Sequence, residues 1–212
     1  MRRSICEKVL LVSVCMMTAR AAAAQAPQPA PTPAPQPAKT PAFTLAVTYA
    51  PEYAQLAPGL CGCFWMQGAG MDAGLRLHKD FGLAVSISGA HVANAAPGVD
   101  VNRIVYLAGE RYTHASTLKQ AARGRQLEYF GQWLLGSSHG FDGVYPGAGG
   151  ARSSANAFAM QGGGGVNLYL NPRVGLRLLE AEYLRSDLPN GASNTQNDLR
   201  LAFGVSYRIG KR

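Results

Sequence analysis

The chain has 212 residues with 25 glycines, 13 prolines, 15% charged residues and a formal net charge of +8. So many helix and strand breakers are typical of a β protein with many turns. The basic residues are scattered, without a Lys/Arg run or a basic helix, so the composition argues against a nucleic-acid-binding protein and we expect no nucleic-acid partner.

The first 24 residues have the composition of a secretory signal peptide, predicted at residues 1–24. Basic residues form a charged start, residues 9–17 form a short apolar run, and residues 22–24 form a small-residue cleavage site. The apolar run is too short to cross a bilayer as a helix, and no later stretch supplies about 18 uninterrupted apolar residues. A lipoprotein signal ending at Cys15 is the alternative, but the bulky Val14 before it disfavours lipid attachment. We therefore expect an exported chain.

Residues 25–41 are almost all Pro, Ala and Gln and form a predicted disordered linker. Such a composition holds a solvated, extended path because it has nothing apolar to bury. At about 3.1 Å per residue the linker would reach on the order of 50 Å. Two interpretations stay open, a passive tether and a segment that crosses the periplasm to meet a cell-wall partner.

Period-two alternation begins after the linker and predicts β-strands. The clearest case is residues 197–209, where large apolar residues fill one face and Asp, Arg, Ala, Gly and Ser fill the other. At more than ten residues this strand is long enough to cross a bilayer at a tilt. The parity is ambiguous around residues 103–112, and the successive Leu178 and Leu179 suggest a bulge. The predicted strands are residues 43–50, 64–77, 81–92, 103–113, 125–136, 156–170, 173–184 and 197–209.

The connections between these strands alternate in length. Three are short, at residues 78–80, 114–124 and 171–173, and four are long, at residues 51–63, 93–102, 137–155 and 186–196. This is the asymmetry of an outer-membrane barrel with periplasmic turns and longer external loops. The sequence therefore predicts one all-β domain at residues 42–212, an eight-stranded antiparallel up-and-down transmembrane β-barrel.

The two strand faces differ in a way that indicates which one meets lipid. If the large apolar face turned inward, the exterior of a soluble barrel would be unusually poor in charge. If that face meets lipid, small and polar residues fill a narrow lumen. The predicted lumen charge network consists of Arg76, Glu128, Arg177, Glu180, Glu182, Arg200 and Arg208. Arg177 and Arg200 are expected to pair with these acids, because buried charge needs a partner, and the lumen would then be closed.

Aromatic side chains near the predicted strand ends would supply the interfacial girdles of such a barrel. They are Phe43, Tyr49, Trp65, Phe81, Tyr112, Tyr169 and Tyr207. The four glycines at residues 162–165 lack the Lys-Ser or Lys-Thr and the helix that follow a phosphate loop. Within a strand they indicate sharp curvature or close packing of a large neighbour such as Tyr.

Cys61 and Cys63 lie in the first predicted external loop, in a compartment that permits disulfides. A bond across one intervening residue is strained, so a possible loop disulfide, a pair of thiols and a metal contact all stay open. A metal site would need further ligands, and no nearby His or acidic cluster supplies them. We therefore expect no metal and no other cofactor.

His139, with Ser137, Ser138 and Asp142, is the only cluster that places a base, a nucleophile and an acid close together in the sequence. Catalysis would require these groups to converge through hydrogen bonds, and a Gly-rich loop supports that geometry poorly. Because some small barrels modify lipids at the membrane rim, a lipid-modifying enzyme is kept as an alternative.

Four segments, at residues 61–68, 131–140, 180–184 and 197–210, carry a resemblance to known proteins. The strand order resembles the small eight-stranded outer-membrane barrels of the OmpA transmembrane-domain, OmpX and opacity-protein kind. More narrowly, the segments are similar to an acidobacterial outer-membrane β-barrel family. The resemblance implies a porin-like fold of a Gram-negative outer membrane but little about activity, since such barrels serve as adhesins, membrane tethers or proteins of unassigned role.

The sequence thus predicts a non-enzymatic integral outer-membrane protein with a closed polar lumen. Its external loops would serve surface contact or membrane integrity, and its linker would lie in the periplasm. The expected partners are outer-membrane lipid, lipopolysaccharide and, during biogenesis, the barrel-assembly machinery. The alternatives are a lipid-modifying enzyme and a small channel.

Overall fold

The computed structural model describes residues 43–55, 63–96, 99–117, 125–147, 149–190 and 194–209. The predicted signal peptide and linker lie outside these residues. Among the described residues, no helix has the length and apolar character that a membrane span requires.

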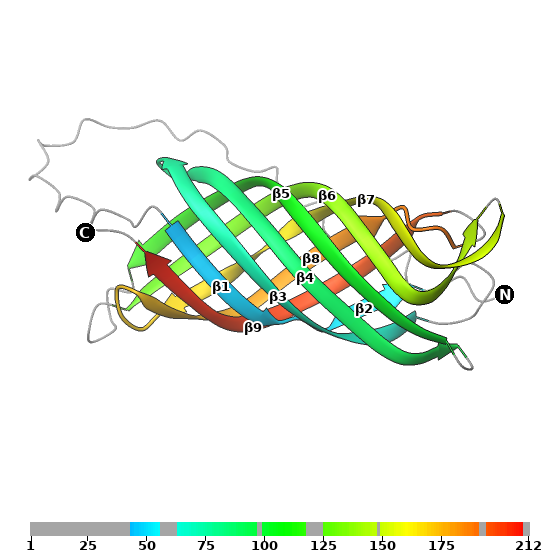
Figure 1. Ribbon diagram of the computed structural model, residues 1–212. Helices are drawn as coiled ribbons and strands as arrows, with labels where there is room; N and C mark the ends of the chain where they lie inside the picture. The colour runs from blue at the N-terminus through cyan, green and yellow to red at the C-terminus, as the bar shows by residue number, and fades with distance from the viewer. Residues whose placement is uncertain are drawn as a thin grey trace, which may run out of the picture. The chain divides into compact units, whose positions relative to one another are not determined.

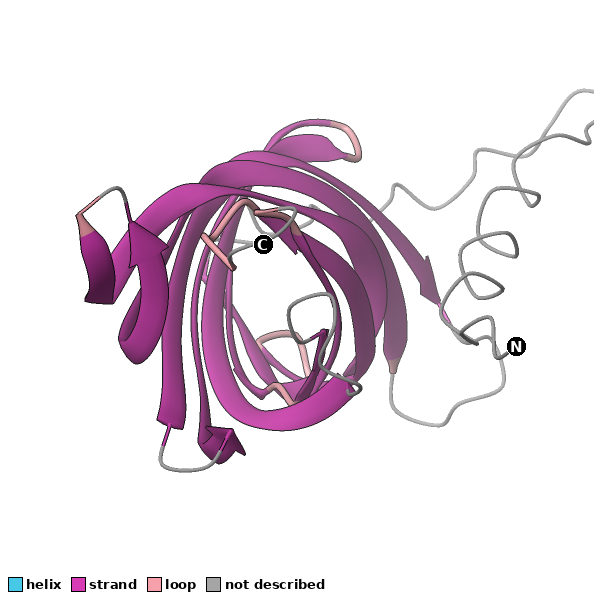
Figure 2. Ribbon diagram, turned by 90° about the vertical axis from the view of Figure 1, so that its right-hand side faces the viewer, coloured by secondary structure: helices cyan, strands magenta, loops and turns pink. Residues whose placement is uncertain are grey.

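Nine antiparallel strands form one closed sheet in the described part of the chain (Figures 1 and 2). They are β1 (Phe43–Tyr49), β2 (Glu52–Gln55), β3 (Cys63–His78), β4 (Phe81–Ala96), β5 (Val99–Thr117), β6 (Gln126–Gly147), β7 (Gly150–Tyr169), β8 (Val174–Ser186) and β9 (Gln196–Ile209). From β3 onward each strand pairs with the next one in the chain. The predicted all-β up-and-down barrel is confirmed.

The first strand of the ring is interrupted, and this explains why nine strands make an eight-stranded barrel. Both β1 and β2 pair with β3 on one side and with β9 on the other. Between them, the Ala50 N–H donates to Gly68 (2.8 Å) and the Pro51 carbonyl accepts from Leu201 (3.0 Å). Pro51 has no N–H to give to the ladder, but the hydrogen bonds of its neighbours keep the ring closed.

The two ends of the barrel differ. At one end, the turn end, β1 begins, β9 ends, and β3–β4, β5–β6 and β7–β8 are connected. The opposite hairpin end carries the β2–β3, β4–β5, β6–β7 and β8–β9 connections (Figure 1). The predicted long loops at residues 93–102 and 137–155 are wrong, because strand structure fills most of both segments. Their Gly, Ala and Ser residues have low strand propensity, but cross-strand hydrogen bonds in a hairpin compensate for it.

Apart from a few register shifts, side chains alternate between a mainly large apolar exterior and an interior that is mostly small, polar or charged. The outward face exposes side chains such as Val47, Leu77, Phe81, Leu83 and Ile87. In β8 the register shifts between Arg177 and Glu180, so Leu178 and Leu179 are both half exposed and the predicted bulge is present. The bulge changes the parity of the strand, and as a result Arg177 and Glu180 both point inward.

Aromatic rings lie near both ends of this apolar exterior. Phe81 and Tyr112 meet edge-on at the turn end with centroids 5.1 Å apart, and Tyr53 and Trp65 meet at the hairpin end at 5.3 Å. The prediction that Tyr169 belongs to a girdle is wrong. Its side chain is only 1% exposed and lies inside the barrel, because its position in β7 has inward parity.

The glycine run in β7 makes room for two aromatic rings from β6. Gly162 pairs with Trp133 on the outside, where the indole lies over the glycine, and Gly165 leaves space for the Phe130 ring on the inside. Close packing of a large neighbour is therefore what these glycines permit, although the neighbours are Trp and Phe and not the suggested Tyr.

Gly162→Ala is expected to displace the Trp133 indole, because a Cβ at residue 162 would lie 2.6 Å from two indole carbons. Because the indole is about half exposed and can move aside, we expect a cost of about 1 kcal/mol, at the lower end of the range for overpacked cores. The effect would be measured as a lower urea midpoint of unfolding in detergent micelles, together with altered tryptophan emission. Gly149→Ala is the matched control, since a Cβ there meets nothing within 4 Å. Equal effects of the two substitutions would contradict this packing role.

Candidate functional site: an ion-paired lumen

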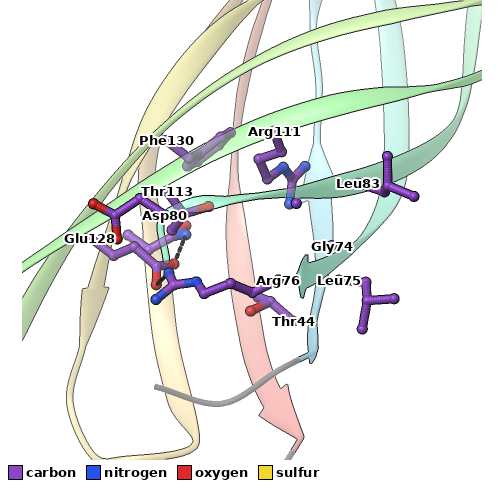
Figure 3. A pocket seen from close by; sticks show the side chains of 12 residues that line it. Thr44, Gly74, Leu75, Arg76, Asp80, Leu83, Arg111, Thr113, Glu128 and Phe130 are labelled. Carbon is purple, nitrogen blue, oxygen red and sulfur yellow. Dashed lines mark hydrogen bonds and ion pairs between the residues drawn. The ribbon is translucent and has the colours of Figure 1, made fainter. Parts of the chain in front are cut away.

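The barrel interior holds a charge network in three layers, and the first layer lies near the turn end. Arg208 Nη2 donates to Glu128 at 2.6 Å. Arg76 approaches the same carboxylate at 3.6 Å (Figure 3). The Arg208 guanidinium also stacks on the Tyr169 ring, 3.2 Å from its centroid. Asn167 Nδ2 donates to the second oxygen of Glu128 at 3.1 Å. This layer ties β3, β6, β7 and β9 together.

The middle layer is built around Asp72 of β3. Its carboxylate accepts hydrogen bonds from Arg111 (2.5 Å) and from Arg177, which also pairs with Glu180 at 2.8 Å. Both guanidinium groups lie over the inward-facing Phe130 ring, with centroid distances of 4.9 and 4.6 Å. Gln132 completes the layer by donating to Glu180 and Glu182. An aromatic ring and two acids thus hold two arginines in the centre of the lumen.

The third layer lies near the hairpin end and joins the first strand of the ring to the last. Glu52 of β2 pairs with Arg103 and, at 3.4 Å, with Arg200. Arg103 also pairs with Asp198 at 2.6 Å, and Arg200 approaches Glu182 at 3.5 Å. Because β2 and β9 adjoin where the barrel closes, these pairs strengthen the seam.

All seven residues of the predicted lumen network are in the interior, and each makes an ion pair there. Five further charged residues belong to the network but were missed: Glu52, Asp72, Arg103, Arg111 and Asp198. Glu52 was assigned to a loop, and the ambiguous parity of residues 103–112 concealed the two arginines. The alternation that places Asp72 beside Arg76 on one face was the signal that could have identified it.

The network balances its charges and leaves little free space. Six arginines and six carboxylates face one another in the described interior. A cavity of about 20 Å³ near Arg76 and Glu128 lies on one side of the middle layer (Figure 3). A cavity of about 10 Å³ beside Asp72 and Arg200 lies on the other side. Each is close to the volume that a single water needs. The ion pairs hold the strands together, and neither of these two cavities among the described residues is large enough for a substrate.

The sequence cluster around His139 does not converge. The imidazole of His139 is hydrogen-bonded to Asn156 (2.7 Å), while Ser137 donates to the Ala157 carbonyl (3.1 Å). Ser138 points into the barrel, and Asp142 accepts from Asn102. The nucleophile, base and acid that the enzyme alternative requires are therefore directed to different partners.

Cys63 begins β3, whereas Cys61 lies outside the described residues, so their possible disulfide stays a prediction. In the part of the chain that the structure describes, no group of three His, Cys, Asp or Glu residues is arranged to hold a metal ion.

Comparisons with known proteins support the fold of the chain but identify no family to which it belongs. No protein-family model and no curated protein matches the chain. Among solved structures, Neisserial surface protein A is 18% identical, with 79% of this chain and 97% of that chain covered and a TM-score of 0.52. Ail of Yersinia pestis, solved with the heparin analogue sucrose octasulfate, is 16% identical over 79% and 97% of the two chains, with a TM-score of 0.49.

The N-terminal β-barrel domain of Pseudomonas aeruginosa OprF is 12% identical over 78% of this chain and 97% of that one, with a TM-score of 0.43. The likeness to Neisserial surface protein A supports the fold of a small outer-membrane β-barrel. The narrower similarity to an acidobacterial family stays a prediction.

Replacing a lumen arginine should destabilise the barrel without opening it. Arg177→Leu leaves Glu180 buried without its arginine and Asp72 with one arginine of two. Breaking a buried pair in this way costs about 3 to 5 kcal/mol. We expect a lower urea midpoint of unfolding and no large increase in planar-bilayer conductance.

Arg185→Leu is the control for the Arg177 substitution, because Arg185 forms an exposed pair with Asp187 at 3.6 Å. Exposed pairs contribute about 0 to 1 kcal/mol. A large gain of conductance with an unchanged midpoint in Arg177→Leu would disprove a closed lumen.

Proposed function

We propose that this protein is a non-enzymatic integral protein of a bacterial outer membrane, in which a closed barrel anchors external hairpins and loops for surface contact. The observation that carries the proposal is the inversion of the two barrel faces. Large apolar side chains cover the exterior, whereas six ion-paired arginines occupy the interior. In water such an exterior would be a very large exposed apolar surface, and in a bilayer it is the favourable arrangement.

Two rows of outward polar groups support a membrane position for the apolar exterior. The hairpin-end row includes His91 hydrogen-bonded to Asn102 and His139 hydrogen-bonded to Asn156, each at 2.7 Å. The turn-end row consists of Asp80, Tyr112 and His114. Hydrogen bonds from His114 and Tyr112 hold the pKa of Asp80 below its usual value, so this rim carries a carboxylate.

The distance between these rows fits a bilayer. On β5, nine residues, 103–111, lie between Asn102 of the hairpin-end row and Tyr112 of the turn-end row. A tilted β-strand crosses the hydrocarbon core with about 9 to 11 residues. The turn end, where β1 begins and β9 ends, would face the periplasm, and the hairpin end, where β6 and β7 extend beyond their other neighbours, would face outward.

Within this proposal, we expect the β6–β7 hairpin to be the element that makes surface contact. Beyond Phe141 and Ser154 the two strands continue to Gly147 and Gly150, with a register shift between Phe141 and Tyr145. Because β5 pairs with β6 only as far as Phe141, and β8 pairs with β7 only from Ala159, the hairpin stands clear of the ring.

Lipid and lipopolysaccharide around the apolar band, and the barrel-assembly machinery during biogenesis, are part of this proposal. The packed lumen argues against a small channel. Ser137, His139 and Asp142 have different hydrogen-bond partners, which argues against a lipid-modifying enzyme. Unchanged lipid A in a His139→Ala strain would agree with that.

The proposal is tested by gel migration of the purified outer-membrane fraction with and without boiling. An intact barrel resists unfolding in detergent, so we expect the unboiled chain to migrate differently from the boiled one. Identical migration, with the protein in the soluble periplasmic fraction, would contradict a membrane barrel. Discrete single-channel steps from the same preparation would favour the channel instead.

The orientation is tested by cysteine labelling in a chain whose Cys61 and Cys63 are replaced by serine. Ser153→Cys lies on the β6–β7 hairpin and should react with a membrane-impermeant maleimide on intact cells. Lys79→Cys lies on the turn between β3 and β4 and should react only after the outer membrane is permeabilised. The reverse pattern would mean that the hairpin faces the periplasm.

A further inference from the structure

We propose that Glu180 and Glu182, two inward-facing acids of β8, form a proton-binding site in the lumen, in which their carboxyl groups share a single proton. The site goes beyond surface contact, because it makes the stability of the barrel depend on pH. The strands that surround it at this level all belong to the described part of the chain.

The backbone of β8 turns both acids inward. The register shift between Arg177 and Glu180 places these two residues on the inner face. Glu182 follows Glu180 at the two-residue spacing that keeps a side chain on the same face. Each of the two acids is only 4% exposed. Burial removes the water that would otherwise weaken the repulsion between two carboxylates.

One amide nitrogen joins the two carboxyl groups. Gln132 Nε2 donates to Glu180 Oε1 at 3.2 Å and to Glu182 Oε1 at 2.7 Å. Gln132 of β6 can reach β8 because the residue between them on β7 is Gly163, which pairs with both Gln132 and Glu182 and has no side chain. The two carboxyl groups also lie within hydrogen-bonding reach of one another. Their Oε1 atoms therefore converge.

The other oxygen of each carboxyl group faces an arginine. Glu180 Oε2 accepts from Arg177 at 2.8 Å, and Glu182 Oε2 lies 3.5 Å from Arg200 Nη1. Neither arginine serves one acid alone, since Arg177 also pairs with Asp72 and Arg200 also pairs with Glu52. The arginines thus approach the outer oxygens, and the inner oxygens of the two acids face each other.

The two layers that contain this pair hold one acid more than they hold arginines. In the turn-end layer Arg76 and Arg208 share Glu128, and Asp80 lines the same cavity as Arg76, so this layer has no positive charge to spare (Figure 3). The rest of the described lumen contains Arg103, Arg111, Arg177 and Arg200 with Glu52, Asp72, Glu180, Glu182 and Asp198. A proton supplies the missing positive charge where two carboxyl groups converge.

Two buried hydroxyl groups face the same place. Ser86 and Ser88 of β4 line the cavity of about 10 Å³ that borders Glu180 and Glu182. They are 8% and 6% exposed, and no hydrogen bond within the described residues involves either hydroxyl. These hydroxyls and the acids can together bind one water. Such a water would carry the proton to and from a site that the barrel wall otherwise closes.

A shared proton determines the direction of the pH dependence. The protonated carboxyl group donates to the neighbouring carboxylate, which is a strong charge-assisted hydrogen bond. When the pair loses its proton, two buried carboxylates repel each other. In the unfolded chain the same side chains are solvated and both are ionised at neutral pH. Folding therefore takes up one proton, and stability falls as the pH rises.

Infrared difference spectroscopy of the full chain in detergent micelles detects the proton directly. A protonated carboxyl group absorbs at a different frequency from a carboxylate, and exchange into deuterium oxide shifts its band. At neutral pH we expect one buried protonated carboxyl group per chain, and we expect Glu180→Gln to lose its band. If the unaltered chain has no such band, the site is overturned.

The urea midpoint of unfolding measures the effect on stability. From about pH 6 to about pH 9 the midpoint of the unaltered chain should fall more steeply than that of Glu180→Gln, whose amide can donate to Glu182 as the protonated acid does. The two slopes should differ by one proton, since the exposed histidines affect both chains equally. Equal slopes would overturn the proposal.

Glu128→Gln is the matched control, because Glu128 is a buried lumen acid that is paired with two arginines. It should lower the midpoint at neutral pH but retain both the infrared band and the pH slope. Loss of the band in this variant as well would contradict a site at Glu180 and Glu182. A midpoint raised by sodium ions at constant ionic strength, without the band, would mean that a metal cation occupies the site instead.

Heat-modifiable migration of the same preparation separates this site from the proposed function. If the unaltered chain shows no heat-modifiable migration, the membrane barrel itself fails. If the barrel is heat-modifiable but has no protonated carboxyl group, only the proton site fails.

Discussion

Closure of the strand ring is the constraint on which the rest of this structure depends. Because β1 and β2 share one position between β3 and β9, the sheet has no free edge along the body of the barrel. Every strand must then place alternate side chains on two very different sides. One side is wide enough for large apolar groups, while the other is barely wide enough for the side chains themselves. The composition of both faces follows from this geometry.

A narrow closed interior also dictates how its charges are used. A buried arginine must have a carboxylate nearby, and here several partners come from strands that face each other across the lumen, as with Arg177 of β8 and Asp72 of β3, or Arg103 of β5 and Asp198 of β9. Such pairs connect strands that do not adjoin in sequence and replace the apolar core of a soluble domain. The small apolar group around Leu134 and Leu184 is an addition to this network.

The two-residue alternation of side chains was sufficient to predict the architecture, because most large apolar and small polar residues fall on opposite faces in β3, β4, β6 and β9. The alternation was not sufficient where apolar and charged residues share one face. In β5, Val105, Leu107 and Arg111 share the inward face, so neither the inward arginines nor the outward Glu110 could be assigned. The β6–β7 hairpin was missed because its Gly, Ala and Ser residues form a strand only by pairing. Such positions are fixed by register, which depends on neighbouring strands.

Closure of the strand ring also explains why the lumen is rigid and the outer surface is free to vary. Paired arginines and acids fill most of the described lumen, and altering one member leaves its partner buried without its counter-charge. Variation that preserves the fold is therefore confined to the hairpin end and to the outward face. On that face the cost of a charged residue falls towards the two interfaces, so ionised groups such as Asp80, which accepts a hydrogen bond from Tyr112, lie at the ends of the apolar band.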